Sequence, residues 1–264
     1  LGDDRAAGRA AWTLAAMTGY VDLDEWRTIP DRSIERLERS GDTWALTETR
    51  VWQAVPHLQR GRNREGLAAL DAAWPDVEEL GNPTLLSGWL LWRSFALLGA
   101  GELLEARRLA ELAARGGGVA SPAHQSQQFF CLAMPARLLG WDDPLLDEAE
   151  PRFRASLRDG EGLATTSYAF LELERLAVVG AHEQVRSLVA VLAALPSAGL
   201  PMFSFTVLAA ELQAAFALGD DAEVDRLLPL ARDAALVYTH EPFAPWGRIV
   251  ADGTGYRWVR DGGE

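Results

Sequence analysis

Residues 101–106 read Gly-Glu-Leu-Leu-Glu-Ala and directly follow an apolar stretch with the composition of a helix. The leading glycine recurs every 39 or 40 residues, each time at the end of such a stretch, at Gly61, Gly101, Gly140, Gly180 and Gly219. Glycine readily adopts the left-handed backbone that ends a helix, and acidic residues after it suit the positive N-terminal end of the next helix. The spacing therefore predicts a series of helical hairpins that turn at these glycines.

The hairpins can be placed along the chain from these turns. The first helix of each is expected at 3–19, 43–59, 84–99, 122–139, 163–179 and 202–218. The second helix of each is expected at 30–40, 64–80, 102–115, 144–158, 182–195 and 221–238. Val21 takes the place of the glycine in the first hairpin, which is therefore a degenerate sixth copy. Five prolines fall inside or at the end of the expected helices and predict kinks or shorter helices there, namely Pro56, Pro75, Pro135, Pro196 and Pro229.

The turn and the residues after it resemble the tetratricopeptide repeat family, in which a turn glycine precedes a Glu-Ala pair. Small residues at Ala110 and Ala113 continue the close-packing face of that family. Seven residues before the glycine, where the family has a small residue, the chain has Ala54, Ser94 and Ala133 but Leu173 and Leu212. The period exceeds the usual length of about 34 residues, and is similar to elongated variants in the helical sensor regions of large bacterial transcription regulators and signalling ATPases. The resemblance covers residues 3–238 and implies an all-α superhelix, or solenoid, of about six hairpins.

The repeat pattern stops at residue 240, which divides the chain into a repeat domain, 1–240, and a C-terminal tail, 241–264. Two short β-prone runs in the tail, 248–251 and 256–259, flank Asp252-Gly253 and predict a β-hairpin. We expect the hairpin to cap the exposed core of the last repeat. The alternative is a strand-donating contact with a neighbouring domain.

The composition of the chain limits the classes of partner that it is expected to bind and the cellular compartment in which it is expected. The formal charge of −13 opposes binding to nucleic acid, because binding to phosphates needs a cationic surface. All 25 basic residues are arginine, a bias typical of a high-GC genome such as that of an actinobacterium. The single cysteine, Cys131, lies in an apolar run, and the sequence has neither a signal segment nor a membrane span, so we expect a cytoplasmic protein without membrane contact. The start at Leu1 suggests excision from a longer chain.

The sequence offers few candidates for a catalytic or metal-binding motif. The four histidines, His57, His124, His182 and His240, lie about sixty residues apart and lack metal-ligand spacing. The acidic segment 142–148 resembles the aspartate-rich magnesium motif of terpene synthases, but it occupies a repeated turn position and has no second metal motif, so helix capping explains it. No nucleophile elbow or phosphate-binding loop occurs. We therefore predict no enzymatic activity, no cofactor and no metal, and keep a magnesium-dependent all-helical enzyme as an alternative.

The family resemblance implies that the first helices line a concave groove, at positions three, six and ten residues before each turn glycine. The groove residues expected on this basis are Val51, Val55, Leu91, Phe95, Phe130, Met134, Arg137, Phe170, Glu174, Gln213 and Phe216. This line is largely apolar and would suit an amphipathic helix, an extended peptide or an apolar small molecule. The same residues could instead face the next helix of the array.

The function expected from these observations is noncatalytic protein or peptide binding. The resemblance implies the sensor or scaffold part of a bacterial regulatory or signalling protein, in transcription regulation for example. A small-molecule or peptide receptor with a closed pocket is the other alternative.

Overall fold

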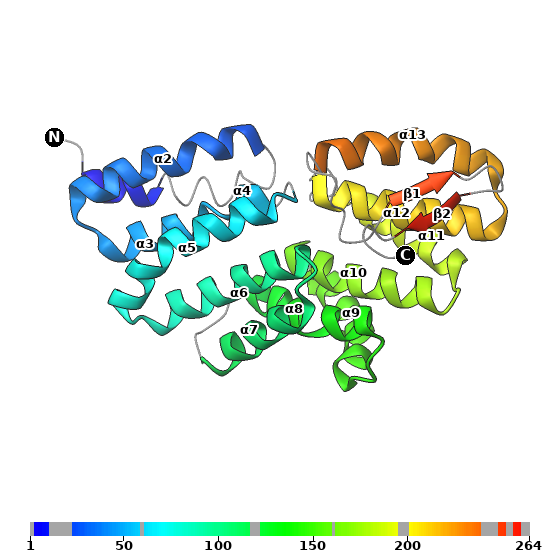
Figure 1. The fold of residues 1–264 in the computed structure, drawn as a ribbon, viewed down its shortest axis with the longest axis horizontal. Coiled ribbons are helices and arrows are strands. Elements are labelled where there is room, and N and C mark those ends of the chain that lie inside the picture. Colours follow the sequence, from blue (N-terminus) through cyan, green and yellow to red (C-terminus); the bar gives the residue numbers. More distant parts are fainter. Residues whose placement is uncertain are drawn as a thin grey trace. The chain divides into compact units, whose positions relative to one another are not determined.

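The computed structural model describes residues 3–10, 23–58, 61–116, 122–159, 162–194, 201–238, 248–251 and 256–259. The described chain is mostly helical and divides into two compact units. The first unit comprises residues 1–58 and 63–135, and the second comprises residues 59–62 and 136–264. Figure 1 shows the helices and the two strands in chain order.

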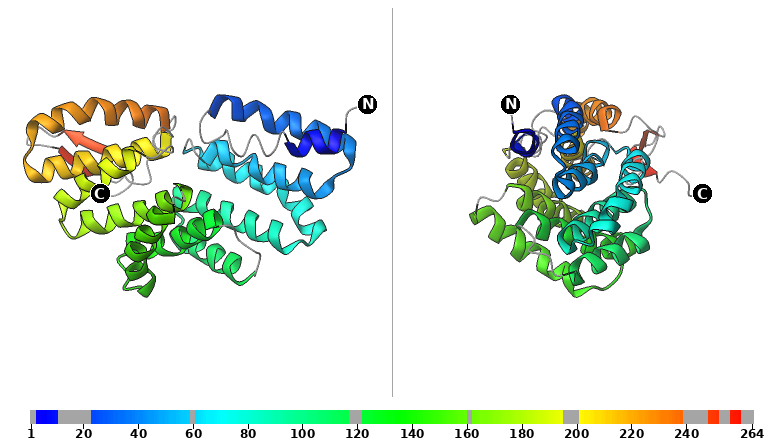
Figure 2. Two further views of the ribbon diagram at one scale, coloured as in Figure 1. Left: turned by 180° about the vertical axis from the view of Figure 1, so that it is seen from behind. Right: turned by 90° about the vertical axis from the view of Figure 1, so that its left-hand side faces the viewer.

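The first unit begins with a helix over residues 4–10. It continues with α2 (Leu23–Ser40), α3 (Thr43–Trp52), α4 (Val55–Leu58), α5 (Asn63–Leu80), α6 (Pro83–Gly99), α7 (Leu103–Arg115) and most of α8 (Pro122–Leu139). Consecutive helices pack against each other from α2 to α3, from α5 to α6 and from α6 to α7 (Figures 1 and 2). The first helices α3 and α6 also contact each other directly.

The second unit contains the 3-10 turn η1 (Pro144–Glu148) and the helices α9 (Ala149–Asp159), α10 (Gly162–Val178), α11 (His182–Ala193), α12 (Pro201–Leu218) and α13 (Asp221–Tyr238). Each of the helices from α9 to α13 packs against the next, and α10 also contacts α12. The strands β1 (Arg248–Ala251) and β2 (Tyr256–Val259) pair antiparallel, with Ile249 opposite Trp258 and Ala251 opposite Tyr256. These strands occupy the two β-prone runs of the tail, whereas the expected capping role is not tested by the pairing.

The turn glycines have the backbone that the sequence predicts. All five have a positive φ, between 68° and 83°. The residue after the glycine donates its N–H to the carbonyl five residues earlier, for example from Trp141 to Ala136 at 2.9 Å and from Asp220 to Ala215 at 3.0 Å. This is the Schellman arrangement, which satisfies the last carbonyls of a helix. Gly41 and Gly81 also have a positive φ and end second helices, which the sequence analysis did not predict.

The prolines have different effects on the helices. The helix expected over 43–59 is interrupted by a turn at Gln53 and Ala54, just before Pro56, and resumes as α4. Pro75, Pro135 and Pro229 lie inside α5, α8 and α13, which continue past them, so the expected shortening does not occur there. Pro75 and Pro229 are exposed, where water can hydrogen-bond the carbonyl that each proline leaves unpaired. Pro196 lies outside the described residues.

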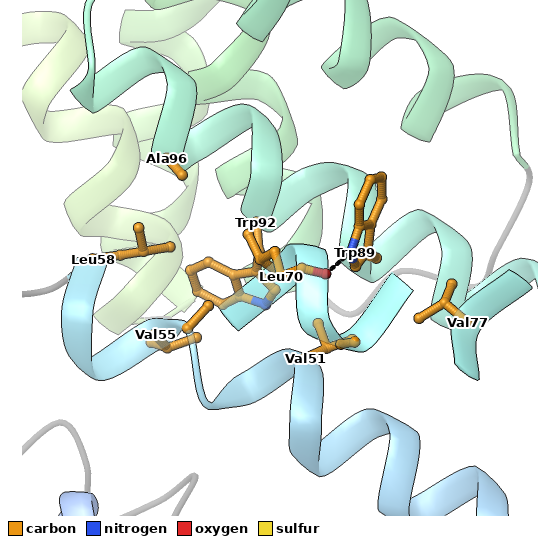
Figure 3. Packing of buried hydrophobic residues seen from close by; sticks show 10 residues of the cluster. Val51, Val55, Leu58, Leu70, Val77, Trp89, Trp92 and Ala96 are labelled. Carbon is orange, nitrogen blue, oxygen red and sulfur yellow. Dashed lines mark hydrogen bonds between the residues drawn. The ribbon is translucent and has the colours of Figure 1, made fainter. Parts of the chain in front are cut away.

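Each unit has its own apolar core. In the first unit, fully buried residues of α3 to α6 gather around Trp92, which is 1% exposed (Figure 3). The indole N–H of Trp89 donates to the carbonyl of Leu70 at 2.8 Å, which ties α6 to α5. In the second unit the described core cluster joins α12 to α13, through Leu212, Ala215, Val224, Leu227 and Ala231.

Candidate functional site

Most of the expected groove residues lie in the core instead of lining a groove. Six of them are at most 7% exposed, namely Val51, Val55, Leu91, Phe130, Met134 and Phe170. Val51 and Val55 pack in the same cluster as Trp92 of the next first helix. Side chains at these positions therefore hold consecutive helices together, and the alternative that they face the next helix applies to them.

The remaining expected residues are distributed over several environments. Phe95 is partly buried, with its ring centroid 6.1 Å from that of Phe130. Arg137 is also partly buried, whereas Gln213 is exposed and Phe216 is 46% exposed. The side chain of Glu174 lies outside the described residues. Phe95 belongs to the first unit, whereas Gln213 and Phe216 belong to the second.

A different line of residues is accessible in the first helices. The position thirteen residues before each turn glycine is partly exposed in all five, and it holds Glu48, Gly88, Gln127, Ser167 and Thr206. The position six residues before the glycine lies two helical turns further on, on the same face. It is accessible at Phe95 and Gln213. We call these seven residues the first-helix stripe, of which Glu48, Gly88, Phe95 and Gln127 belong to the first unit and the rest to the second.

The stripe lies between two buried faces of each first helix. The residues ten, seven and three before the glycine pack toward the following helices, as Val51, Ala54 and Leu58 do in the first unit. The residues twelve and five before it pack toward the preceding helices, as Trp89 and Ala96 do. The sequence signal that could have located the stripe is its composition, because small or polar residues recur thirteen residues before the glycine while apolar residues recur at ten.

The stripe carries hydrogen-bonding groups and almost no charge. Gln127 and Gln213 each offer a donor and an acceptor, and the hydroxyl groups of Ser167 and Thr206 can do either. Only Glu48 is ionisable. α3 packs against α6, and α10 packs against α12, so in each unit the stripe positions of two first helices are on neighbouring elements.

The arginines near the first helices of the first unit are bound to neighbouring helices. Arg50 donates to Glu38 of α2 at 3.0 Å and to Asp76 of α5 at 2.5 Å, and these two hydrogen bonds raise its pKa, the one to Asp76 most. Arg93 pairs with Asp71 of α5, and its guanidinium lies 5.2 Å from the ring centroid of Trp89. These guanidinium groups connect four helices, namely α2, α3, α5 and α6.

The second unit has a comparable set of ion pairs. Arg175 donates to Glu172 at 2.6 Å, and Arg186 of α11 donates to Asp220 at the start of α13 at 2.6 Å. Arg226 pairs with Glu223 at 2.5 Å and lies 3.6 Å from Glu211. Burial raises the pKa of Glu211, which the nearby Arg226 partly offsets. Arg186 and Arg226 thus connect different helices of the second unit.

The acidic residues and the cysteine that could act in catalysis or bind a metal either form contacts within the helices or are buried. Asp143 caps η1 by accepting the N–H of Leu145 at 3.0 Å, and Glu148 pairs with Arg152 at 2.6 Å. Cys131 is fully buried, and burial raises the pKa of its thiol to about 12, so the reactive thiolate is suppressed. Within the described residues, no three side chains of His, Cys, Asp or Glu are grouped so that they could hold a metal ion.

None of the described helices combines the length and the apolar composition that crossing a bilayer requires. Comparisons with protein-family models, with curated proteins and with solved structures found no match to the chain.

Proposed function

We propose that the chain is a noncatalytic helical-repeat domain that binds an extended peptide segment of a partner protein along the part of the first-helix stripe that lies in the first unit, at Glu48, Gly88, Phe95 and Gln127. The observation that carries the proposal is that the same position is accessible in each of the five first helices that end at a turn glycine, and that it holds a small or polar residue each time. An extended peptide has N–H and C=O groups that must keep hydrogen-bond partners when it binds. A glutamine side chain such as that of Gln127 supplies both a donor and an acceptor without requiring a particular peptide sequence.

The repeat architecture supports the proposal at the level of the fold. The hairpin period and the left-handed turn glycines agree with the tetratricopeptide-like array that the sequence resembles, and so do the contacts of α3 with α6 and of α10 with α12. On this basis we propose that the chain serves as the sensor or scaffold part of a bacterial regulatory protein. The apolar ring of Phe95 would accept one apolar side chain of the peptide.

The test is to pan a phage-displayed library of random peptides against the purified chain and to measure the affinity of recovered peptides by fluorescence anisotropy. Gln127→Ala, in the stripe on α8, is expected to weaken binding by about tenfold, the effect of losing one or two hydrogen bonds. Gln125→Ala is the matched control, because it removes the same side chain from another face of the same helix. Failure to recover any peptide, or equal losses in both variants, would contradict the proposal.

Two further measurements on the same preparation address the other functions that the sequence allows. Native mass spectrometry would reveal a copurified small molecule if the chain is a receptor with a closed pocket. A shift of the melting temperature on titration with magnesium chloride would favour the magnesium-dependent enzyme instead. Either result without peptide binding would replace the present proposal.

A further inference from the structure

The outer face of the last helical hairpin differs from the same face of the earlier hairpins. At three residues before the turn glycine, Leu58 is 0% and Leu98 is 4% exposed, Arg137 and Ala177 are partly exposed, and Phe216 of α12 is 46% exposed. At ten residues before it, the earlier first helices have side chains at most 7% exposed, while Ala209 of α12 is partly exposed. In the first unit the following helices cover these positions. α12 is the last first helix among the described residues.

Other exposed apolar residues of this hairpin do not distinguish it. Leu218 is exposed, but so are Leu139 and Val179 at the same distance from their turn glycines. Leu230 likewise corresponds to Leu112 and Val191, which are exposed in earlier second helices. Exposure at these positions therefore also occurs in earlier repeats. Phe216 and Ala209, in contrast, are more exposed than the described residues at the same positions of the earlier first helices.

The C-terminal hairpin has one apolar face. Alternate residues of a strand lie on the same face of a sheet, and the pairing of β1 with β2 puts Ile249 opposite Trp258 and Ala251 opposite Tyr256. These four residues therefore share one face, and none of them is charged. The other face has Arg248, Val250, Arg257 and Val259. An isolated two-stranded sheet is at best marginally stable, so an apolar face of this kind needs a surface to pack on.

We propose that the C-terminal hairpin packs its Ile249–Trp258 face on the outer face of α12, at Ala209 and Phe216, and so closes the repeat array. The hairpin belongs to the same compact unit as α12. Residues 239–247 connect α13 to β1, and a segment of this length can span about 30 Å, slightly more than the 27 Å or so along α12. Terminal repeats of such arrays need a cover of this kind, because an open end otherwise invites stacking of further chains.

The proposal is independent of peptide binding, because it concerns the end of the array and the peptide site concerns the stripe. Its test therefore needs no peptide. The single native cysteine, Cys131, is 0% exposed and its thiol has a pKa raised to about 12, so a thiol reagent modifies only introduced cysteines. The rate at which N-ethylmaleimide labels Ala209→Cys then measures how well the outer face is covered.

Three chains that all carry Ala209→Cys are compared. The first has no other substitution, the second also has Ile249→Ser, and the third also has Val250→Ser. The two serine substitutions shorten neighbouring aliphatic residues on opposite faces of β1. Ile249→Ser is expected to speed labelling at least about tenfold, the effect of losing the burial of one isoleucine, and Val250→Ser to leave the rate unchanged. Ala222→Cys, at an exposed position of α13, gives the rate for an uncovered thiol.

Three outcomes would overturn the proposal. The first is labelling of Ala209→Cys as fast as that of Ala222→Cys, and the second is an equal effect of both serine substitutions. The third is a labelling rate that falls as the protein concentration rises, because a second copy of the chain then covers the face. Hydrogen exchange of the α12 amides is a further check, measured in chains that carry one serine substitution and no introduced cysteine, so that α12 itself is unchanged. Faster exchange is expected for Ile249→Ser but not for Val250→Ser.

Discussion

Asp42 connects two helices through one carboxylate. It caps α3 by accepting the N–H of Ala45 at 3.3 Å, and it accepts the Nε–H groups of Arg5 at 2.9 Å and Arg9 at 2.7 Å from the helix over 4–10. The hydrogen bond from Arg9 is the largest reason why the pKa of Asp42 falls from 3.8 to about 2. A carboxylate with a lowered pKa stabilises the folded state above its unfolded pKa, and this contribution is lost as the pH falls through the folded pKa.

The unsubstituted chain is accordingly expected to lose stability between about pH 4 and pH 2, as Asp42 becomes protonated. Asp42→Asn is expected to remove this loss. Because both arginine side chains are about half exposed or more, at 62% and 49%, solvent screening reduces the cost at neutral pH to about 1 kcal/mol. Urea unfolding followed by circular dichroism at a series of pH values measures both effects. Asp4→Asn is the control, since Asp4 pairs with Arg39 at an exposed site and should change the pH profile much less.

Gly99 is the second residue with a specific structural requirement. A Cβ at this position would lie 2.6 Å from the side-chain amide of Asn63, which is buried at the start of α5. Gly99→Ala is expected to destabilise the chain by about 1–3 kcal/mol, because Asn63 must shift within a packed site. Gly88→Ala on the same helix meets nothing within 4 Å and should stabilise by about 0.5–1 kcal/mol through helix propensity. Thermal melts that move in the same direction for both variants would contradict this reading.

At the scale of the elements, the sequence predicted helix ends better than helix faces. The turn glycines locate the hairpins because their backbone requirement is local, and α8, α12 and α13 begin and end within one residue of the expected positions. Gly41 and Gly81 end second helices with a positive φ, but the later second helices α7 and α11 end at Gly116 and Ala194 without one, so a glycine at this place does not recur along the chain. Which residues of a first helix are accessible depends on two neighbouring helices, and that is not a local property of Val51 or Phe130.

The turn glycines can be tested singly at Gly140, between α8 and η1. Its φ is 69°, and an added Cβ would have nothing within 4 Å, so only the backbone opposes a side chain there. Gly140→Ala is expected to cost about 1–2 kcal/mol in the free energy of unfolding. Gly140→Asn should cost less, since asparagine tolerates the left-handed region. Equal losses from alanine and asparagine in chemical denaturation would show that the backbone conformation is not the cause.

At the scale of the whole molecule, proteins built from helical repeats are stabilised by contacts between neighbouring repeats. A destabilising substitution in one repeat therefore has little effect on the stability of distant repeats. Tryptophan emission reports mainly on the first unit, because seven of the ten tryptophans lie before residue 136, at Trp12, Trp26, Trp44, Trp52, Trp74, Trp89 and Trp92. Circular dichroism reports on helices of both units. The two probes can therefore separate the unfolding of the units.

Leu70→Ala and Leu227→Ala form a matched pair, because both leucines are 0% exposed, one in the core of each unit. Each substitution is expected to cost about 2–5 kcal/mol locally. Leu70→Ala should lower the midpoint of urea unfolding seen by tryptophan emission. Leu227→Ala should lower the midpoint seen by circular dichroism and leave the emission transition almost unchanged. If both probes shift together in both variants, the two units unfold as one cooperative body, and the contacts between neighbouring helices are strong enough to carry a change from one end of the chain to the other.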